Sequence, residues 1–378
     1  MKFEIQQTEL ATVLQSIGRA VPSRTPIPVM KNILLDVDDG QLLVAAANGI
    51  YKVSIDVDVD IAESGAVTVP GKNFVRYITS LSAGPVTLEL LEQELHVEAG
   101  RSTAHFSTTK AEEFPVLPKA AFSAPKVKAA TFVDVARKVA IASSTDDSHP
   151  ILKGLYVEYQ ADGLYLAAAD GFRASQAQIP YMGERIDKKA TIPNETLDVL
   201  LRLSPNGDWM LMANENQLVV TNEMGSEESF SLESSVLGGQ FPDVTRLCPD
   251  QPLDEYRTVV TVTVALFREI LKRAMIFGAG TKDYVRIDIW EEGLDVTARD
   301  STGGGRSKVG AGVQGEPVSI GLNGRYLDEF LSVVDTTHID MLINSPSHPV
   351  VFHEANAESG QSFSYVHVLM PMATRNTV

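Results

Sequence analysis

Apolar residues recur along the chain at positions i, i+3, i+4 and i+7, the spacing of one face of an amphipathic helix. The spacing is complete five times and partial once, and it predicts two helices in each third of the chain. The residues concerned are Leu10, Val13, Leu14 and Ile17; Phe74, Tyr77, Ile78 and Leu81; Phe132, Val135, Ala136 and Val139; Leu197, Leu200 and Leu201; Phe267, Ile270, Leu271 and Ala274; and Leu327, Phe330, Leu331 and Val334. Thr8 and Thr131 stand where N-cap residues are expected.

Between these helical segments apolar and polar residues alternate, which indicates β-strands. In each third of the chain an acidic residue and a glycine separate two such runs, at Asp39-Gly40, Asp162-Gly163 and Glu292-Gly293. We expect tight hairpins there, because glycine accepts the positive φ that such turns require. The three glycines lie 123 and 130 positions apart.

The recurrence of helices and hairpins indicates three repeats of about 125 residues, which is the size of a repeated domain rather than of a solenoid unit. Each repeat is predicted to hold two helices and about eight short strands. We place the boundaries near Ala121 and Pro252, which gives domains at 1–121, 122–252 and 253–378. The predicted fold class is α+β, with two helices packed on antiparallel sheets in every domain.

Composition is ordinary for a soluble globular protein, with 44% hydrophobic and 21% charged residues. We find neither an apolar signal segment at the start nor an apolar run long enough to span a membrane. The one cysteine, Cys248, excludes an internal disulfide framework and a cysteine-rich metal site. A cytoplasmic, nucleoid-associated location is expected.

The chain has 49 acidic and 32 basic residues, for a net charge of -17. This balance argues against an open DNA-binding patch, because neutralisation of phosphates by Lys and Arg supplies most non-specific affinity. A protein that encircles DNA needs only a locally basic lining. Each predicted helix carries at least one basic residue away from its apolar stripe; the candidates for DNA contact are Arg19, Lys72, Arg76, Arg137, Lys138, Arg202, Lys272, Arg273 and Arg325. Surface helices commonly carry such residues, and Asp134, Asp198, Asp328 and Glu329 share some of these faces.

In a closed ring, these basic residues could face DNA in the central hole. Twelve helices, each roughly 10 Å across, would line a circle about 120 Å around and leave a hole roughly 28 Å wide, enough for duplex DNA and a layer of water. Three repeats in one chain then require two chains, and two-fold dimers are the commonest closed oligomers.

Several short motifs are spread over the whole chain in a characteristic order. They are Met-Lys-Phe at the start, Pro-Ile-Pro at 26–28, Ala-Ala-Asp-Gly-Phe-Arg at 168–173, Gln-Phe-Pro-Asp at 240–243 and Val-Leu-Met-Pro-Met at 368–372. In this order the sequence resembles the bacterial DNA polymerase III beta subunit, the beta sliding clamp family. The resemblance implies a head-to-tail homodimeric ring, with helices inside and a continuous sheet outside, that gives replication its processivity. It also implies a protein without catalytic activity or cofactor.

The resemblance further implies a hydrophobic site between the second and third domains that receives short motifs from the replicative polymerase, the clamp loader and repair proteins. Methionines there would adapt to varied apolar ligands, and Arg173 and Arg246 would anchor polar groups of the peptide at the rim. Met370 and Met372 could also simply fill the core of a last strand. Matched position by position, the site is Leu152, Ala169, Gly171, Phe172, Arg173, Ala174, Pro242, Arg246, Leu247, Val368, Leu369, Met370, Pro371 and Met372.

The family also implies a dimer interface formed by Ala104 and Phe106 on one side and by Ile276 and Phe277 on the other. Arg24 matches a DNA-contacting loop in the first domain. Two departures from the family are a longer end, Ala373–Val378, and Pro150 and Ile151 where the second domain's DNA loop can carry aromatic residues.

Evidence for catalysis is weak. Gly303-Gly304-Gly305-Arg306 lacks the Gly-Lys-Ser/Thr of a phosphate-binding loop and is predicted to be a turn. Asp146, Asp147 and His149 could support a metal-dependent hydrolase, but they lack a partner cluster at recognisable spacing. A repeat scaffold without a DNA role is the other alternative, and it predicts no preference for circular over linear DNA.

Overall fold

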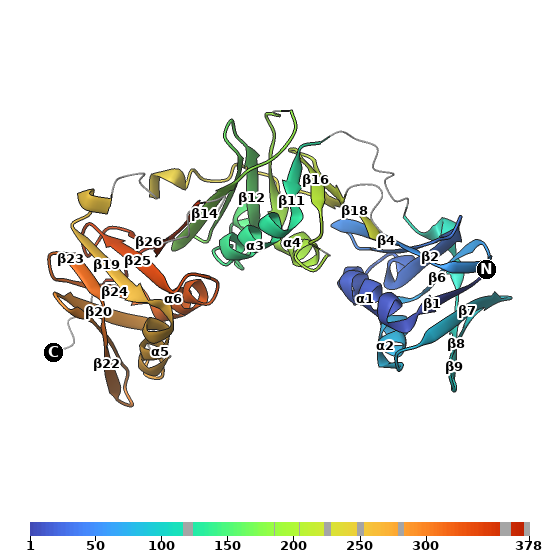
Figure 1. Ribbon diagram of the computed structural model, residues 1–378, viewed down its shortest axis with the longest axis horizontal. Coiled ribbons are helices and arrows are strands. Elements are labelled where there is room, and N and C mark those ends of the chain that lie inside the picture. The colour runs from blue at the N-terminus through green and yellow to red at the C-terminus, as the bar shows by residue number, and fades with distance from the viewer. Residues whose placement is uncertain are drawn as a thin grey trace. The chain divides into compact units, whose positions relative to one another are not determined.

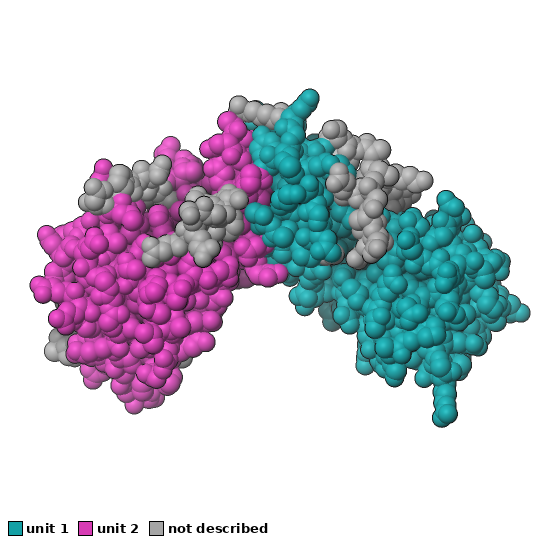
Figure 2. Space-filling view, in the orientation of Figure 1, with its two compact units in different colours: residues 1–133, 181–236 teal, residues 134–180, 237–378 magenta. Residues whose placement is uncertain are grey.

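The computed structural model describes residues 1–115, 124–184, 186–203, 205–222, 228–247, 253–278, 283–355 and 364–373. The chain forms two compact units, each built from two segments (Figure 2). Unit 1 consists of residues 1–133 and 181–236, and unit 2 of residues 134–180 and 237–378. The predicted boundaries at Ala121 and Pro252 lie outside the described residues, so the domain limits stay a prediction.

Unit 1 contains two antiparallel sheets, with strand orders β5-β1-β7-β8-β9 and β10-β6-β2-β3-β4-β18-β17-β16-β11. Helices α1 and α2 pack side by side, α1 on β3 and β4 and α2 on β2 and β6 (Figure 1). The strands are β1 (Lys2–Gln6), β2 (Asn32–Asp38), β3 (Gln41–Ala47), β4 (Tyr51–Asp58), β5 (Asp60–Glu63), β6 (Gly65–Pro70), β7 (Pro85–Leu91), β8 (Glu94–Ala99), β9 (Ser102–Ser107), β10 (Thr109–Lys110), β11 (Lys126–Lys128), β15 (Lys189–Pro193), β16 (Asp208–Ala213), β17 (Gln217–Asn222) and β18 (Glu228–Ser235). The helices are α1 (Gln7–Ile17), α2 (Gly71–Ser80) and α4 (Asn194–Leu200), with short 3-10 turns η1 (Gly18–Ala20), η2 (Pro28–Lys31) and η3 (Ala111–Glu113).

Unit 2 is also built on antiparallel sheets: one runs in the order β12-β13-β14-β27-β26-β25-β19-β23 and the other in the order β22-β21-β20-β24. Helices α5 and α6 contact each other and pack on these strands (Figure 1). The strands are β12 (Gly154–Tyr159), β13 (Leu164–Ala169), β14 (Arg173–Ile179), β19 (Thr258–Thr263), β20 (Tyr284–Trp290), β21 (Gly293–Arg299), β22 (Gly304–Gly310), β23 (Gly312–Gly315), β24 (Val318–Asn323), β25 (His338–Ile343), β26 (Val350–Ala355) and β27 (Ser364–Leu369). The helices are α5 (Val264–Met275) and α6 (Gly324–Leu331), with 3-10 turns η4 (Pro150–Leu152), η5 (Thr245–Leu247) and η6 (Leu253–Glu255); α3 (Ala129–Ala140) begins in unit 1 and ends in unit 2.

All six predicted helices are present, and one buried residue from each stripe is Leu10, Phe74, Phe132, Leu197, Phe267 and Leu327. Leu81, Leu201 and Val334 of the predicted stripes lie beyond the ends of α2, α4 and α6 and are half-buried. The predicted N-caps are wrong. Helix α1 follows β1 directly, and α3 follows β11 directly, so Thr8 and Thr131 fall inside the first turns. The position before each helix is therefore occupied by the last residue of the preceding strand, Gln6 before α1 and Lys128 before α3.

The three predicted hairpins are present, but their glycines serve two different purposes. Asp39 and Gly40 have φ angles of 45° and 83° in the turn between β2 and β3, as predicted. Gly163 and Gly293 do not have positive φ. A Cβ at Gly163 would lie 2.7 Å from the Ile179 carbonyl oxygen, and one at Gly293 would overlap the carbonyl of Val309. At these two positions glycine is required by the close approach of the neighbouring strand.

Two strand pairs join segments that are far apart in the sequence. In unit 1, β4 pairs with β18, for example Lys52 with Glu233. In unit 2, β14 pairs with β27, for example Arg173 with Leu369. The second pairing brings residues of the middle of the chain beside residues of its end, and it positions the candidate site.

Candidate functional site

The loop between β13 and β14 exposes a large aromatic side chain. Asp170 Oδ1 accepts hydrogen bonds from the backbone N–H groups of Phe172 (2.9 Å) and Arg173 (3.0 Å). Gly171 has a φ of 89°, which a residue with a side chain rarely adopts. The loop is thereby fixed with Phe172 pointing outwards, 65% exposed.

The end of β27 lies against this loop. Val368 and Leu369 pair with Ala174 and Arg173 of β14. Beyond the strand, the Met370 N–H donates to the Phe172 carbonyl at 2.8 Å, and Met370 is 37% exposed. The Met372 N–H donates to the carbonyl of Gly321 at 2.8 Å. The structure therefore brings the 169–174 and 368–372 parts of the predicted site together.

Leu247, at the end of η5, is the residue that joins two apolar clusters beside this site. It packs against the cluster of Ala167, Ala169, Ala174 and Val244. It also packs against the cluster of Tyr256, Val259, Leu342, Val351 and Val368. Arg246 beside it is 85% exposed and its Nε donates to Asp243 Oδ2 at 3.1 Å, so it is available at the surface. Pro242 is exposed, and Leu152, which ends η4, is half-buried.

The predicted site residues thus divide by exposure. Gly171, Phe172, Pro242, Arg246 and Met370 are exposed, and Leu152, Leu247, Pro371 and Met372 are half-buried; Ala169, Arg173, Ala174, Val368 and Leu369 are buried. The exposed Phe172 and Met370 lie together and form a small apolar surface, because the Met370 N–H donates to the Phe172 carbonyl. The buried residues can only support that surface from below.

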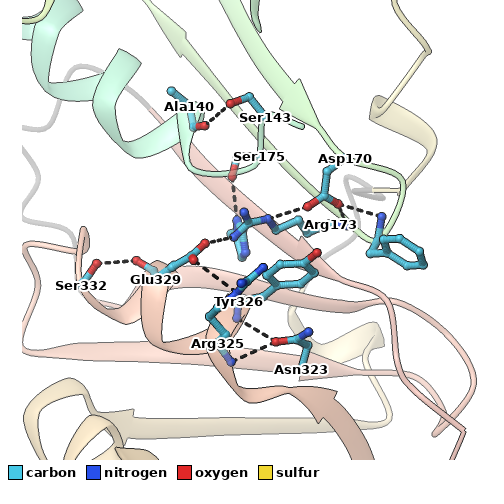
Figure 3. Close-up of polar contacts among 12 residues, drawn as sticks. Ala140, Ser143, Asp170, Arg173, Ser175, Asn323, Arg325, Tyr326, Glu329 and Ser332 are labelled. Carbon is cyan, nitrogen blue, oxygen red and sulfur yellow. Dashed lines mark hydrogen bonds and ion pairs between the residues drawn. The ribbon is translucent and has the colours of Figure 1, made fainter. Parts of the chain in front are cut away.

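Arg173 is one of the supporting residues, so the prediction that it anchors a peptide at the rim is wrong. It is 8% exposed. Its Nε donates to Asp170 Oδ2 at 2.9 Å, its Nη1 donates to Glu329 Oε2 at 2.5 Å, and its guanidinium lies 4.1 Å from the ring centre of Tyr326 (Figure 3). We call Asp170, Arg173, Tyr326 and Glu329 the Arg173 cluster. Burial raises the pKa of Tyr326, and the charge of Asp170 adds to the effect.

A buried serine–histidine pair lies on the same two strands. The Ser175 Oγ and His367 Nδ1 atoms are 2.7 Å apart, and both residues are fully buried. The His367 ring stacks on Phe330, with ring centres 4.8 Å apart. Burial, together with the charge of Arg173, lowers the pKa of His367 to about 3, so the ring is neutral.

This pKa makes the stability of unit 2 depend on pH. The unfolded chain binds the proton with a pKa near 6.5 and the folded chain with a pKa of about 3, so acid favours unfolding below pH 6.5. From this residue we expect the free energy of unfolding to fall by about 1.5 kcal/mol between pH 6.5 and 5.0, and further towards pH 3. Urea unfolding at several pH values measures the loss. The His367→Gln variant should lack this pH-dependent loss of unfolding free energy, whatever its stability at neutral pH. If the unfolding free energies of the two proteins fall equally with pH, the loss does not come from His367.

Most of the predicted DNA-contacting cations are exposed. They are Arg19, Arg24, Lys72, Arg76 and Arg202 in unit 1 and Arg137, Lys272, Arg273 and Arg325 in unit 2. The Lys72 Nζ donates to Ser23 Oγ at 2.5 Å, which brings the start of α2 beside the segment that carries Arg24. Arg273 is ion-paired with Glu269 on its own helix.

Lys138 does not lie on an outward face, and this prediction is wrong. The residue is 2% exposed and its Nζ lies 2.7 Å from Asp335, 3.0 Å from Glu354 and 3.8 Å from Asp134. Counting six positions on from Phe132 places Lys138 only about 60° around the helix from Val135, at the border of the apolar stripe. Arg137, one position earlier, is exposed as predicted.

Two of the predicted dimer residues lie on β9, the edge strand of one sheet, and the other two follow α5, which packs on β22, the edge strand of another sheet. Phe106 on β9 is half-buried and packs edge-on against Phe74 and Tyr77, with ring centres 5.4 and 5.7 Å apart; Ala104 is half-buried on the same strand. Ile276 after α5 is 72% exposed. A Cβ at Gly305 would lie 2.9 Å from the Phe277 ring, so glycine lets Phe277 lie on the backbone of β22. Gly304 and Gly305 therefore begin a strand, where a turn was predicted.

The residues of the hydrolase alternative lie in an exposed loop and bond to its own side chains and backbone. Asp146 accepts from Ser148, which lowers the pKa of its carboxyl, and Asp147 pairs with Lys153. Over the described ranges, no group of three or more His, Cys, Asp or Glu residues is placed to hold a metal ion. Within the same ranges no helix combines the length and apolar character needed to cross a membrane.

Comparisons with known proteins give one consistent result. The DNA polymerase III beta subunit N-terminal domain matches residues 1–118, its central domain 126–243 and its C-terminal domain 251–373. A beta sliding clamp of Synechococcus elongatus is 30% identical over 363 residues, covering 93% of this chain and 95% of the relative. The beta sliding clamp of Escherichia coli is 24% identical over 379 residues, covering 98% and 100%. The crystal structure of the DNA polymerase beta subunit of Streptococcus pyogenes has a TM-score of 0.89 at 20% identity, covering 99% of this chain and 100% of that one.

Proposed function

Because the chain belongs to the DNA polymerase III beta subunit family, we propose that it is a DNA sliding clamp that encircles duplex DNA during replication. The observation that carries this proposal is the run of three matched clamp domains along one chain. The two helices that the sequence predicts for each repeat are also present. Such a protein tethers other enzymes and has no catalytic activity of its own.

The proposed ring is a head-to-tail homodimer. Strand β9 ends one sheet of unit 1, and β22 ends one sheet of unit 2. An edge strand offers a row of N–H and C=O groups to another chain, so pairing β9 of one copy with β22 of the other would continue both sheets. The exposed Ile276 and the half-buried Phe106 and Phe277 beside these edges support this arrangement.

DNA contact is proposed to be electrostatic and independent of sequence. The nine exposed cations on or next to the helices are the candidates: Arg19, Arg24, Lys72, Arg76, Arg137, Arg202, Lys272, Arg273 and Arg325. Cations that face phosphates position DNA without reading its bases. An excess of acidic residues elsewhere would limit adhesion to other surfaces. Lys138 is left out of this set, since its charge is neutralised inside unit 2.

The surface formed by Phe172, Met370, Leu247 and Arg246 is the proposed docking site for short motifs of the replicative polymerase, the clamp loader and repair proteins. Its exposed apolar side chains and adjacent exposed arginine suit a peptide with apolar anchors and one acidic or polar group. The sequence lacks a nucleotide-binding motif of the phosphate-loop type, so opening the ring would need an external ATP-driven loader.

The test is topological. The protein is loaded on nicked circular DNA, and the circle is then cut by a restriction enzyme at moderate salt. A clamp is expected to remain on the intact circle and to leave the cut one over its free ends. Equal retention on both forms would reject encirclement, and the salt dependence of retention on short linear duplexes serves as the control for simple electrostatic binding.

A further inference from the structure

The Arg173 cluster is a buried charged group with partners from two distant parts of the chain. Asp170 belongs to the loop that carries Phe172, whereas Tyr326 and Glu329 belong to α6. Arg173 and Glu329 are 156 positions apart in the sequence. A guanidinium that is 8% exposed depends on its carboxylate partners, because an unpaired buried charge is costly. Its planar fork also fixes the directions of those partners.

Asp170 connects the Arg173 side chain to the backbone of Phe172, which belongs to the proposed docking site. Its side chain is 9% exposed. One carboxylate oxygen accepts from the Arg173 side chain, and the other accepts from the backbone of Phe172 and Arg173. The Phe172 carbonyl in turn accepts from the Met370 N–H. The orientation of one carboxylate therefore bears on both exposed apolar side chains of the docking surface.

Glu329 is at the other end of the cluster, and it is shared between two arginines. Its Oε2 accepts from Arg173 at 2.5 Å, and its Oε1 lies 3.7 Å from the Nε of Arg325. Arg325 lies in the first turn of α6 and is 60% exposed, and its guanidinium is 5.6 Å from the ring centre of Tyr326 (Figure 3). The same carboxylate thus contacts a buried arginine and an exposed arginine that is a candidate for DNA contact.

We infer that Glu329 couples DNA contact at Arg325 to partner binding at Phe172 and Met370; the inference rests on the clamp function proposed above. A phosphate that draws Arg325 away removes a competing cation from Glu329. The carboxylate then pairs with Arg173 alone, which holds Asp170 and the Phe172 loop more firmly. DNA in the ring therefore strengthens the binding of a partner peptide, and by linkage the peptide strengthens the contact of Arg325 with DNA.

A double-mutant cycle on the full-length protein tests this coupling. The probe is a fluorescein-labelled peptide from the clamp-binding segment of a bacterial replicative polymerase, and its Kd is measured by fluorescence anisotropy without DNA. Glu329→Gln is expected to raise the Kd about tenfold, because Arg173 loses a charged partner. Arg325→Ala is expected to lower the Kd about threefold, because it removes the competitor for Glu329. In the double variant the effect of Arg325→Ala should vanish.

If the contact between Arg325 and Glu329 only stabilised the fold, Arg325→Ala would not bind the peptide more tightly than wild type. The matched control is the exposed pair Arg257 and Glu316 of the same unit, where Arg257→Ala and Glu316→Gln are expected to leave the Kd unchanged. A second measurement compares free wild-type protein with protein loaded on nicked circles, where the Kd should fall about threefold, but not in Arg325→Ala.

The outcomes separate the two proposals. If wild-type protein does not bind the peptide, the docking site of the proposed function is wrong. If it binds, but Arg325→Ala has the same Kd as wild type or acts equally in the Glu329→Gln background, the coupling is wrong and the clamp function stands. Glu329→Gln protein with a native circular dichroism spectrum and an unchanged Kd would also overturn the coupling.

Discussion

Replacing Lys138 with methionine is expected to lower the free energy of unfolding of unit 2 by about 3–5 kcal/mol. The ammonium of Lys138 is 2% exposed, and the Glu354 side chain that it contacts is 4% exposed. Burial lowers the pKa of Lys138, but its hydrogen bonds to Asp335 and Glu354 outweigh burial, so the pKa lies above its usual value. Methionine fills similar space without charge, so Glu354 keeps the hydrogen bond from the backbone N–H of Asp335 but loses its contact with the Lys138 ammonium.

Urea unfolding, with hydrogen exchange to assign the transition to unit 2, measures this loss. Arg137→Met is the matched control, since Arg137 is the exposed neighbour on the same helix and should change stability by no more than about 0.5 kcal/mol. The double variant Lys138→Met with Glu354→Gln should recover part of the loss, because it removes the unpaired charge as well. Equal stabilities of Lys138→Met and Arg137→Met would show that the buried ion pairs do not hold this part of the fold.

If the proposed homodimer forms, replacing Ile276 with aspartate is expected to raise its dissociation constant by at least about thirtyfold, which corresponds to the loss of an interface hot spot. Ile276 is 72% exposed in the single chain, so the substitution should cost little folding energy while it places a charge in the proposed interface. Phe277→Asp should act in the same direction. Because the Phe277 ring lies on Gly303 and Gly305, that variant can also loosen β22.

Sedimentation velocity over a range of concentrations measures the dimer. Leu266→Asp is the control: Leu266 is another exposed apolar residue of the same helix region, at 49%, and is not among the interface candidates. We expect Ile276→Asp to sediment as a monomer at concentrations where Leu266→Asp remains a dimer. An unchanged dimer in Ile276→Asp would remove the end of α5 from the interface.

The features predicted correctly from the sequence are those that a short window of residues determines. Leu10 and Leu14, for example, are one helical turn apart, so their spacing alone places them on one buried face. The same holds for the turn at Asp39-Gly40. Gly163 and Gly293 show the limit of such reasoning, because the carbonyl that excludes a side chain there belongs to a neighbouring strand.

In the candidate site, too, the sequence indicates positions but not the contacts between residues that are distant in the sequence. The resemblance to a family supplied positions such as Phe172 and Met370, but not the contacts that hold them. Lys138 and Glu354 are 216 positions apart, and helix periodicity contains no information on a partner at that distance. Helix periodicity places Glu329 as an acidic residue on a basic face and does not indicate its contact with Arg173. Asp170 could have been found, because an aspartate two residues before Phe172 and followed by glycine favours a turn in which its side chain accepts from the backbone.

The pairing of β4 with β18 can form only late in the synthesis of the chain. After β4 leaves the ribosome at residue 58, another 176 residues must follow before β18 is complete to residue 234, the last in register with β4. At about 5–20 residues per second this takes roughly 9–35 s. During that time one side of β4 is an open strand edge on a nascent polypeptide, next to identical polypeptides on the same messenger RNA. Lys52, Asp56 and Asp58 place charges along that edge, the feature by which natural proteins discourage mispairing between copies.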